Sequence, residues 1–503
     1  PLALEIAAAR LRVLSPRQLL AGLGGGLSLV AREVDRPARQ RSLRDTIQWS
    51  YDLLDPGARR VLRMLSVAPG GADFETAEAL SALGPADGAE RPLDPVDTLG
   101  ELVDASLVRV VDGVDGEPRV RLLHVVREFA VEALSAAGES ENARRRLAER
   151  MADVAAEQGA QVHGTTRLRT LDRLAAEMDN VREALEWSLA EGPGSDPDRV
   201  ALGLRTTVAL GSYWQHHGQA SEGRRWLERA ISQSEAQRDL AVAGAEPGER
   251  TAALEALQSL AGILYRQGET VAAERALTRT VAAWRELGRD DLLAGGLATL
   301  GLCQRVHADL DGARVTLQES LEVARRVADP GLVAGALTDL GILETDAGDS
   351  VRAADLFSQA IAVEEPTGDI WGPAVSRANL AVALLESSQP DEAFEVLAKV
   401  VPVLPQLNDI ELTIVVLDGL AATLVQLGDD ARAARGYGAA ERLRAEAGMP
   451  MPERDRQEVE KAMAPARKRL GDRGWLDAVA EGSAATQEDA LRDALAHSLL
   501  RSP

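Results

Sequence analysis

A repeat with a period of 40 residues constrains this chain more than any other feature of its sequence. A leucine followed by a small residue recurs in one register, at Leu260-Ala261, Leu300-Gly301, Leu340-Gly341, Leu380-Ala381 and Leu420-Ala421. An earlier copy, Leu210-Gly211, lies 50 residues before the first of these, and its spacer contains Gly244, Pro247 and Gly248, which indicate a loop insertion. Self-similarity at such a period is typical of stacked structural repeats.

Three further positions keep the same register. Seven residues after each small residue stands a position suited to ending a helix with positive φ: Gly218, Gly268, Ala308, Gly348, Ser388 and Gly428. Twelve residues after it stand Gly223, Ala273, Ala313, Ala353, Ala393 and Ala433, and sixteen after it stand Leu227, Leu277, Leu317, Phe357, Leu397 and Tyr437. Small residues let two helices cross closely and the large residue fills the next gap, so the pattern predicts helical hairpins.

These residues resemble the tetratricopeptide (TPR) pattern of a Leu-Gly pair followed by an alanine and, four residues on, a large side chain. The resemblance extends from about Thr206 to Ala447. Because a TPR repeat has about 34 residues, longer helices or loops are expected here. An acidic residue recurs before each first helix and is expected to cap it, at Asp290, Asp329, Asp369 and Asp409. The alternative is an ordinary helical bundle with a chance periodicity.

Composition and charge limit the kinds of protein to consider. The formal net charge of the 503 residues is −23, which disfavours direct binding of nucleic acid. The single cysteine, Cys303, excludes a disulfide framework and suits the cytoplasm. No run of 18 apolar residues is present, so neither a membrane span nor a membrane partner is predicted. Since the chain begins at Pro1 within an apolar helical pattern, we expect it to be part of a longer protein.

The N-terminal portion follows a different pattern. Four helices are predicted at 42–53, 58–66, 74–82 and 94–104, and two β-rich runs at 107–111 and 119–123 flank the turn at 112–116. A further helix is predicted over 124–136. Helices with a terminal hairpin form a winged helix. Because the hairpin carries Asp112, Asp115 and Glu117 against Arg109 and Arg119, we expect a role within the protein rather than DNA contact.

Longer segments carry a more specific resemblance. They are PLALEIAAARLRVLSPRQLLAGL (1–23), RQRSLRDTIQWSYDLLDPGARRVLRMLSVAPGGADFETAEAL (39–80), RLLHVVREFAVEAL (121–134), LDRLAAEMDNVREALEWSL (171–189), SEGRRWLERAI (221–231) and KRLGDRGWLDAVAEGSAATQEDALRDAL (468–495). They resemble STAND-type signalling ATPases, specifically the actinobacterial NB-ARC-like group in LuxR- or SARP-type transcription regulators. That group joins an ATPase core to a winged helix and then to TPR repeats.

The expected fold is therefore mainly α, a winged-helix domain followed by a TPR-like α-solenoid. The resemblance implies that residues 1–40 end the helical part of an NB-ARC-like module. Residues 41–137 are the expected winged helix and residues 138–200 a helical linker. About six TPR repeats are expected over 201–447, and capping helices over 448–503.

The resemblance also implies two nucleotide-binding residues. Pro1 resembles the proline of a Gly-x-Pro motif that packs on adenine, and the alternative is a simple helix-starting proline. His124 lies where the family has a Met-His-Asp motif whose histidine contacts the β-phosphate of ADP, although Leu123 and Val125 replace the methionine and aspartate. The alternative is a packing residue at a strand-to-helix junction. ATP or ADP with Mg²⁺ is expected in the full-length protein.

Motifs for catalysis and metal binding were also sought. The sequence has no Gly-x-x-x-x-Gly-Lys-Ser/Thr loop, so no cofactor, no catalytic residue and no enzyme activity are predicted for this chain alone. Cys303 and His307 are spaced like half of a zinc site, but no second pair accompanies them, so we predict ordinary packing and no metal.

The first helix of each TPR hairpin is expected to line a concave groove. Counted from the repeat register, the inward positions are Gln215, Gln258, Tyr265, Arg266, Arg305, Thr345 and Glu386. Their mixed polarity suits a peptide or acidic ligand, and the alternative is a solvated face. Expected partners are a protein, a peptide or a small-molecule inducer, together with the chain's own NB-ARC domain, and a ligand-induced oligomer is possible.

Three functions agree with these observations. The leading hypothesis is the ligand-sensing portion of a STAND-type transcription regulator, in which the repeats control an upstream nucleotide switch. The second is a TPR adaptor without nucleotide coupling. The third is the sensor of a protein with a cyclase or kinase effector.

Overall fold

The computed structural model describes residues 43–81, 95–159, 167–190, 196–216, 219–240, 247–449, 451 and 453–496. The chain divides into two compact units, and each is described separately. The first consists of Pro1–Ala160, Arg169–Tyr213 and Ser221–Ala256, and the second of Gln161–Leu168, Trp214–Ala220 and Leu257–Pro503. Pro1 and the predicted end of the ATPase module lie outside the described residues.

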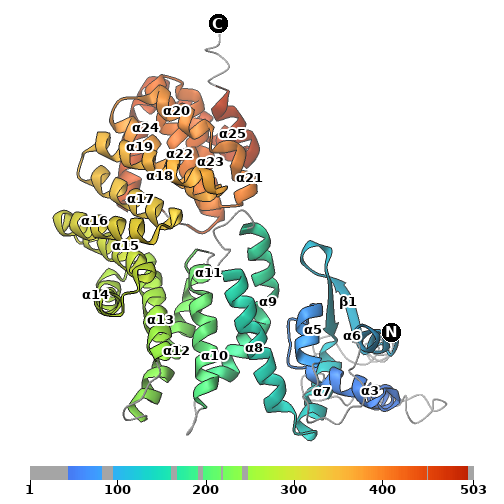
Figure 1. Cartoon of the computed structure of the whole chain (residues 1–503). Coiled ribbons are helices and arrows are strands. Elements are labelled where there is room, and N and C mark those ends of the chain that lie inside the picture. Colours follow the sequence, from blue (N-terminus) through green and yellow to red (C-terminus); the bar gives the residue numbers. More distant parts are fainter. Residues whose placement is uncertain are drawn as a thin grey trace. The chain divides into compact units, whose positions relative to one another are not determined.

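The first unit begins with a winged helix (Figure 1). Its elements are α3 (Leu43–Leu53), α4 (Pro56–Leu65), α5 (Phe74–Ser81), α6 (Pro95–Asp104), β1 (Val108–Asp112), the 3₁₀ turn η3 (Val114–Gly116), β2 (Pro118–Leu122) and α7 (His124–Ala136). These bounds agree with the sequence-predicted elements within two residues. Local chemistry sets the start of α4, because Asp55 Oδ1 accepts the Ala58 amide at 2.8 Å and Pro56 occupies the first turn.

The sheet of this domain is an antiparallel pair with a short third edge. Val110 of β1 faces Val120 of β2, and an isolated bridge joins Ala72 to Val120 on the other side. Ala58, Leu62, Leu80 and Leu102 have at most 1% exposure, so the three central helices enclose one apolar core. Four more helices complete the first unit: α8 (Ser140–Gly159), α9 (Arg167–Ser188), α10 (Pro197–Ala209) and α12 (Ala220–Leu240).

The second unit consists of helical hairpins and a cap. The helices are α14 (Thr270–Leu287), α15 (Asp290–Val306), α16 (Leu310–Val327), α17 (Pro330–Asp346), α18 (Ser350–Glu364), α19 (Trp371–Glu386), α20 (Pro390–Ala398), α21 (Leu404–Leu407), α22 (Ile410–Leu427), α23 (Asp430–Glu446), α24 (Glu453–Ala484) and α25 (Gln487–Leu495), with the 3₁₀ turns η4 (Glu365–Thr367) and η5 (Val401–Val403). Two further helices, α11 (Gly211–His216) and α13 (Pro247–Arg266), cross the boundary between the units.

The repeat register corresponds to real packing positions. The alanines at 273, 313, 353, 393 and 433 are completely buried. The helix-ending residues Gly268, Ala308, Gly348, Ser388 and Gly428 all have positive φ, between 59° and 83°. The mainly α fold, a winged helix followed by a TPR-like α-solenoid, is thus confirmed.

One capping prediction is wrong. Asp329 and Asp409 accept amide hydrogen bonds at the starts of α17 and α22, and Asp369 accepts the Trp371 and Gly372 amides of α19. Asp290, however, is the first residue of α15, and its carboxylate pairs with Arg326 at 3.0 Å. Arg289 occupies the N-cap position instead, so the helix begins one residue earlier than predicted.

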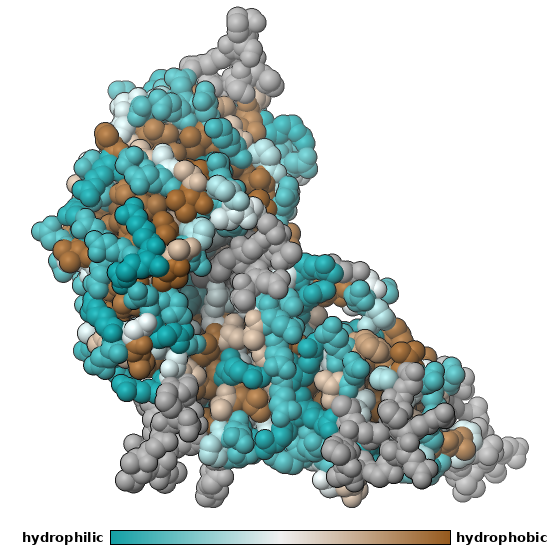
Figure 2. Space-filling view, in the orientation of Figure 1, coloured by the Kyte–Doolittle hydropathy of each residue, from teal (hydrophilic) through white to brown (hydrophobic). Residues whose placement is uncertain are grey.

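The end of the second unit is closed by α24 and α25, and Figure 1 shows these helices beside α22 and α23. Close contact requires glycine here: a Cβ atom on Gly438 would lie 2.2 Å from the Val479 carbonyl oxygen. In the part of the chain that the structure describes, one helix, α22, is long and apolar enough to cross a membrane, and 56% of that window is buried inside the unit. Figure 2 shows hydrophilic residues over much of the visible surface, with apolar residues between them.

Candidate functional site

His124 is the first residue of α7, directly after strand β2. The preceding Leu123 has an extended backbone and offers no side-chain oxygen to the first amides of the helix. The imidazole is 81% exposed, and its Nε2 lies 3.3 Å from Glu128 Oε1. An exposed imidazole beside uncapped amides at a helix N-terminus is chemically suited to an anion.

A cavity of about 480 Å³ opens beside this histidine. Besides His124, the basic residues that line it are Arg44, Arg127 and Arg144. Two of these cations are occupied: Arg44 Nη2 donates to Glu132 at 2.5 Å and Arg127 Nε donates to the Ser66 carbonyl at 2.8 Å. Arg144 is exposed and has no hydrogen-bond or ion-pair partner among the described residues.

Carboxylates also line this cavity, from Glu128, Glu132 and Glu183. The position of Glu183 on α9 brings a fourth helix to the cavity, in addition to α3, α7 and α8. His124 and Arg144 are the donors of this lining that suit a phosphate, whereas the three carboxylates oppose one. The nucleotide role of His124 stays a prediction, and Pro1, the predicted adenine contact, lies outside the described residues.

The predicted groove residues Gln215 and Gln258 make the same contact in successive helices. Gln215 Nε2 donates to the Ser259 carbonyl and Gln258 Nε2 to the Leu292 carbonyl, each at 3.1 Å. Gln258 Oε1 also accepts the Trp284 indole N–H at 2.8 Å. Both amides thus hold neighbouring helices together, and a ligand role for them stays a prediction.

Tyr265, Arg305 and Asp346 form a chain of polar contacts across α13, α15 and α17. Against the effect of burial, Tyr265 and Asp346 both raise the pKa of Arg305, whose Nη1 donates to Asp346 Oδ2 at 2.5 Å. The half-buried Asp339 lies near the same guanidinium, and burial raises the pKa of its carboxyl to about 7, against the opposing charge of Arg305. Sequence reasoning missed Asp339. In the 40-residue register its position corresponds to Ser259, Thr299 and Asn379 of the other repeats.

The remaining groove candidates are also engaged. Arg266 Nη2 lies 3.5 Å from Glu411 Oε2, which connects α13 to α22. Glu386 accepts a hydrogen bond from Ser350 at 2.6 Å, and Thr345 donates to the Gly341 carbonyl at 3.0 Å. Because each of the two groove arginines is already paired with a carboxylate, the groove offers an acidic ligand less positive charge than the sequence indicated.

Cys303 and His307 have separate surroundings. Burial raises the pKa of the Cys303 thiol to about 11, with the charge of Glu274 acting in the same direction. The two ring nitrogens of His307 lie 2.9 Å from Glu274 and 2.8 Å from Thr270. Within the described ranges, no group of three or more His, Cys, Asp or Glu residues could hold a metal ion.

The helix that would face DNA in a helix-turn-helix is α6. Its sequence, PVDTLGELVD, contains three carboxylates and no basic residue. Arg119, counted as a wing charge from the sequence, is only 7% exposed and turns into the protein. Helix α6 therefore presents no basic side chain to a phosphate.

Comparison with known families identifies the N-terminal domain. The family model of the winged helix-turn-helix domain matches residues 54–135. Residues 54–135 form a winged helix-turn-helix domain. The rest of the chain lies outside this match.

Curated relatives and solved structures were also compared. A putative HTH-type transcriptional regulator of Mycobacterium tuberculosis is 29% identical over 373 residues, or 74% of this chain and 36% of the relative. An uncharacterized protein of the same species is 40% identical over 145 residues, 28% of this chain and 35% of that protein. This chain thus spans about a third of the length of these relatives.

Among solved structures, a STAND protein with a tetratricopeptide repeat sensor from Pyrococcus horikoshii aligns with 97% of this chain and 72% of its own. Its TM-score is 0.47 and its identity 15%. A Rap protein complexed with Competence and Sporulation Factor aligns with 70% of this chain and 99% of its own, with a TM-score of 0.43 and 12% identity.

Proposed function

We propose that this chain is the regulatory and ligand-sensing portion of a STAND-type transcription regulator. The observation that carries the proposal is the exposed His124 at the start of α7, in a cavity where Arg144 has no partner among the described residues. The match of most of this chain to putative transcriptional regulators supports the regulatory role. The acidic α6 supports a winged helix-turn-helix domain that acts within the protein rather than on DNA.

In this proposal the winged helix-turn-helix domain faces the nucleotide of an upstream NB-ARC-like ATPase domain. His124 and Arg144 hold the terminal phosphate of ADP through charge-assisted hydrogen bonds, and the first amides of α7 face the same negative charge. The nucleotide would be bound with Mg²⁺ in the upstream domain and would supply the phosphate group that these residues contact. This chain would then stabilise the ADP-bound closed state.

The helical repeats would supply the input to this switch. A protein, peptide or small-molecule inducer that binds the groove more tightly in the open state shifts the equilibrium toward that state. Opening then exposes surfaces for assembly into an oligomer. The paired groove arginines favour a ligand that is neutral or basic rather than acidic.

The test uses the longer protein that includes the upstream segment. Release of a fluorescent ADP analogue is measured for wild type, for His124→Ala, and for His307→Ala as a remote histidine control. Loss of a hydrogen bond to a charged group costs about 1.5–3 kcal/mol, so His124→Ala should speed release by ~10-fold or more. Equal release rates in all three proteins would support an adaptor without nucleotide coupling instead.

A further inference from the structure

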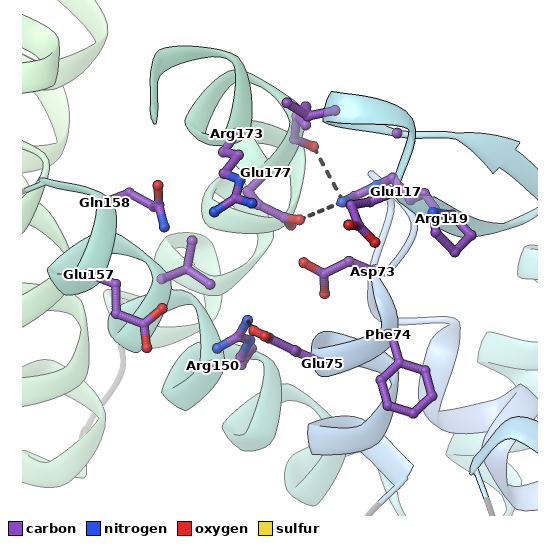
Figure 3. Close-up of a pocket in the computed structure, with 15 residues that line it drawn as sticks. Asp73, Phe74, Glu75, Glu117, Arg119, Arg150, Glu157, Gln158, Arg173 and Glu177 are labelled. Atoms are coloured by element: carbon purple, nitrogen blue, oxygen red, sulfur yellow. Dashed lines mark hydrogen bonds and ion pairs between the residues drawn. The ribbon is translucent and has the colours of Figure 1, made fainter. Parts of the chain in front are cut away.

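Arg119 of β2 is a buried cation with several acceptors. Its Nη1 donates to Glu177 Oε1 of α9 at 2.5 Å, its Nε to the Gly70 carbonyl at 2.9 Å and its Nη2 to the Gly71 carbonyl at 3.0 Å. Figure 3 shows this guanidinium reaching the carboxylate of Glu177, with a second contact to the Ala176 carbonyl. Both side chains of the ion pair are at most 8% exposed.

Asn180 completes this arrangement one turn further along α9. Its Oδ1 accepts the Gly70 amide at 2.9 Å, while its Nδ2 donates to the Gly71 carbonyl at 2.8 Å and to Glu177 Oε2 at 2.6 Å. We call Arg119, Glu177 and Asn180 the wing clamp. Removing one partner from such a buried network leaves an uncompensated charge or amide, so the clamp fixes β2 against α9.

The same helix contacts the His124 cavity and a repeat helix. Glu183 of α9 lines the cavity that contains His124. On the same helix, Arg182 donates to Glu222 of α12 at 2.8 and 2.9 Å, and Glu186, about one turn further on, accepts from Arg229 of α12 at 2.8 Å. The Arg182 hydrogen bond lowers the pKa of Glu222, as expected for a formed pair.

The chain connects the wing clamp directly to His124. Arg119 precedes His124 by five residues, and β2 ends at Leu122 just before α7 begins. The intervening Val120 is tied to Ala72 by two backbone hydrogen bonds of 2.9 and 2.8 Å. A shift of α9 therefore moves β2 and the start of α7 together, because the buried clamp does not stretch.

We infer that α9 is the coupling helix of this protein, which transmits the position of the repeat helix α12 to the His124 site through the wing clamp. The inference rests on the proposed function for the meaning of that site, but the mechanical link stands on its own contacts. A cavity of about 440 Å³, lined by the wing residues Gly113 and Glu117 and by Arg119 and Glu177, adjoins the clamp and gives the wing room to move.

The test is hydrogen–deuterium exchange of the 503-residue chain, with residues 118–128 as the reporter. Glu177→Gln should speed exchange in this segment by about 100-fold, since breaking a buried pair costs several kcal/mol. Arg182→Gln removes the ion pair between α9 and Glu222 of α12. It should also speed exchange over 118–128, by about threefold. Asp172→Asn, an exposed carboxylate on the same helix, is the control and should change nothing.

Two outcomes would overturn the inference. One is exchange over 118–128 in Glu177→Gln equal to that of Asp172→Asn. The other is an effect of Arg182→Gln confined to α12, which would show that α9 does not transmit. If Glu177→Gln does not fold, Arg119→Lys keeps the buried charge and should speed exchange over 118–128 to a smaller extent. The exchange experiment needs no nucleotide. Unchanged ADP release in His124→Ala would therefore remove the proposed function but would leave the coupling through α9 untouched.

Discussion

Phe357 of α18 packs directly over Gly341 of α17, and a Cβ atom on Gly341 would lie 2.6 Å from its ring. The preceding repeat has the same contact, with Leu317 2.6 Å from a Cβ atom placed on Gly301. The small residue of the first helix thus faces the large residue of the second helix in both of these hairpins. This pair sets how closely the helices approach and explains why the two residue types recur together.

Gly341→Ala should lower the urea midpoint, because the added methyl group has no room against Phe357 and overpacking costs about 1–3 kcal/mol. Gly335→Ala on the same helix is the matched control, since its added Cβ meets nothing within 4 Å. That variant should raise stability by about 0.5–1 kcal/mol through helix propensity. The measurement is the urea unfolding midpoint, monitored by circular dichroism. Equal changes of the midpoint in both variants would contradict the packing argument.

Ala308→Gly should stabilise the repeats. Ala308 ends its helix at φ 63°, a left-handed conformation that costs an alanine about 1 kcal/mol relative to glycine. Ala347→Gly is the control, since Ala347 has φ −77° and gains nothing from a glycine. Thermal unfolding of the three proteins should therefore place Ala308→Gly above wild type and Ala347→Gly at or below it. The reverse order would show that the left-handed turn is not strained.

Most of the fold could be predicted because its signals are local. The start of α4 follows from Asp55-Pro56, and the helix ends follow from glycine or a small residue at one register position. The error at Asp290 has the same origin: Arg289, Asp290 and Asp291 offer adjacent candidate starts, and only tertiary packing selects among them. The break between α20 and α21 reflects Pro402, which has no amide hydrogen to continue α20, while Pro405 occupies the first turn of α21.

Asp339→Asn should stabilise the protein in a pH-dependent way. The folded pKa of Asp339 is raised to about 7, so the folded state binds more protons than the unfolded state between about pH 4 and pH 7. Wild-type stability therefore falls as pH rises through this window and is constant above it. The neutral asparagine escapes this loss, so its advantage should grow across this window toward an upper bound of about 4 kcal/mol at pH 8 and disappear near pH 4.

The measurement is urea denaturation at pH 4 and pH 8, compared between wild type and Asp339→Asn. Asp355→Asn, which removes an exposed carboxylate on α18, is the control for the change in net charge. A stability difference for Asp339→Asn that does not change with pH would show that its carboxyl is not buried as described.

The candidate site was only partly visible in the sequence. His124 was found through its resemblance to the histidine of the family's Met-His-Asp motif, but Arg144 was not, since it lies on another helix 20 residues later. The wing clamp was also missed because Arg119 and Glu177 are 58 residues apart and each belongs to a polar pattern typical of a surface. Only the tertiary structure shows that this pair is buried.

Arg144→Ala should weaken nucleotide retention if its unpaired guanidinium faces phosphate. In the longer protein, ADP release should become ~10-fold faster, the effect expected for one hydrogen bond to a charged group. Arg109→Ala, an exposed arginine on β1, is the control for loss of positive charge and should leave release unchanged. Release that is equally fast in both variants would indicate a general charge effect rather than a site.

His124 and Arg144 hold the same phosphate in the proposed function, and a double-mutant cycle on ADP release measures whether they do. Two residues that act on one group are coupled, with an interaction energy of about 0.5–3 kcal/mol. The double variant His124→Ala/Arg144→Ala should therefore release ADP more slowly than the product of the two single effects predicts. A double variant whose release rate equals the product of the two single effects, or single variants that match wild type, would contradict the claim.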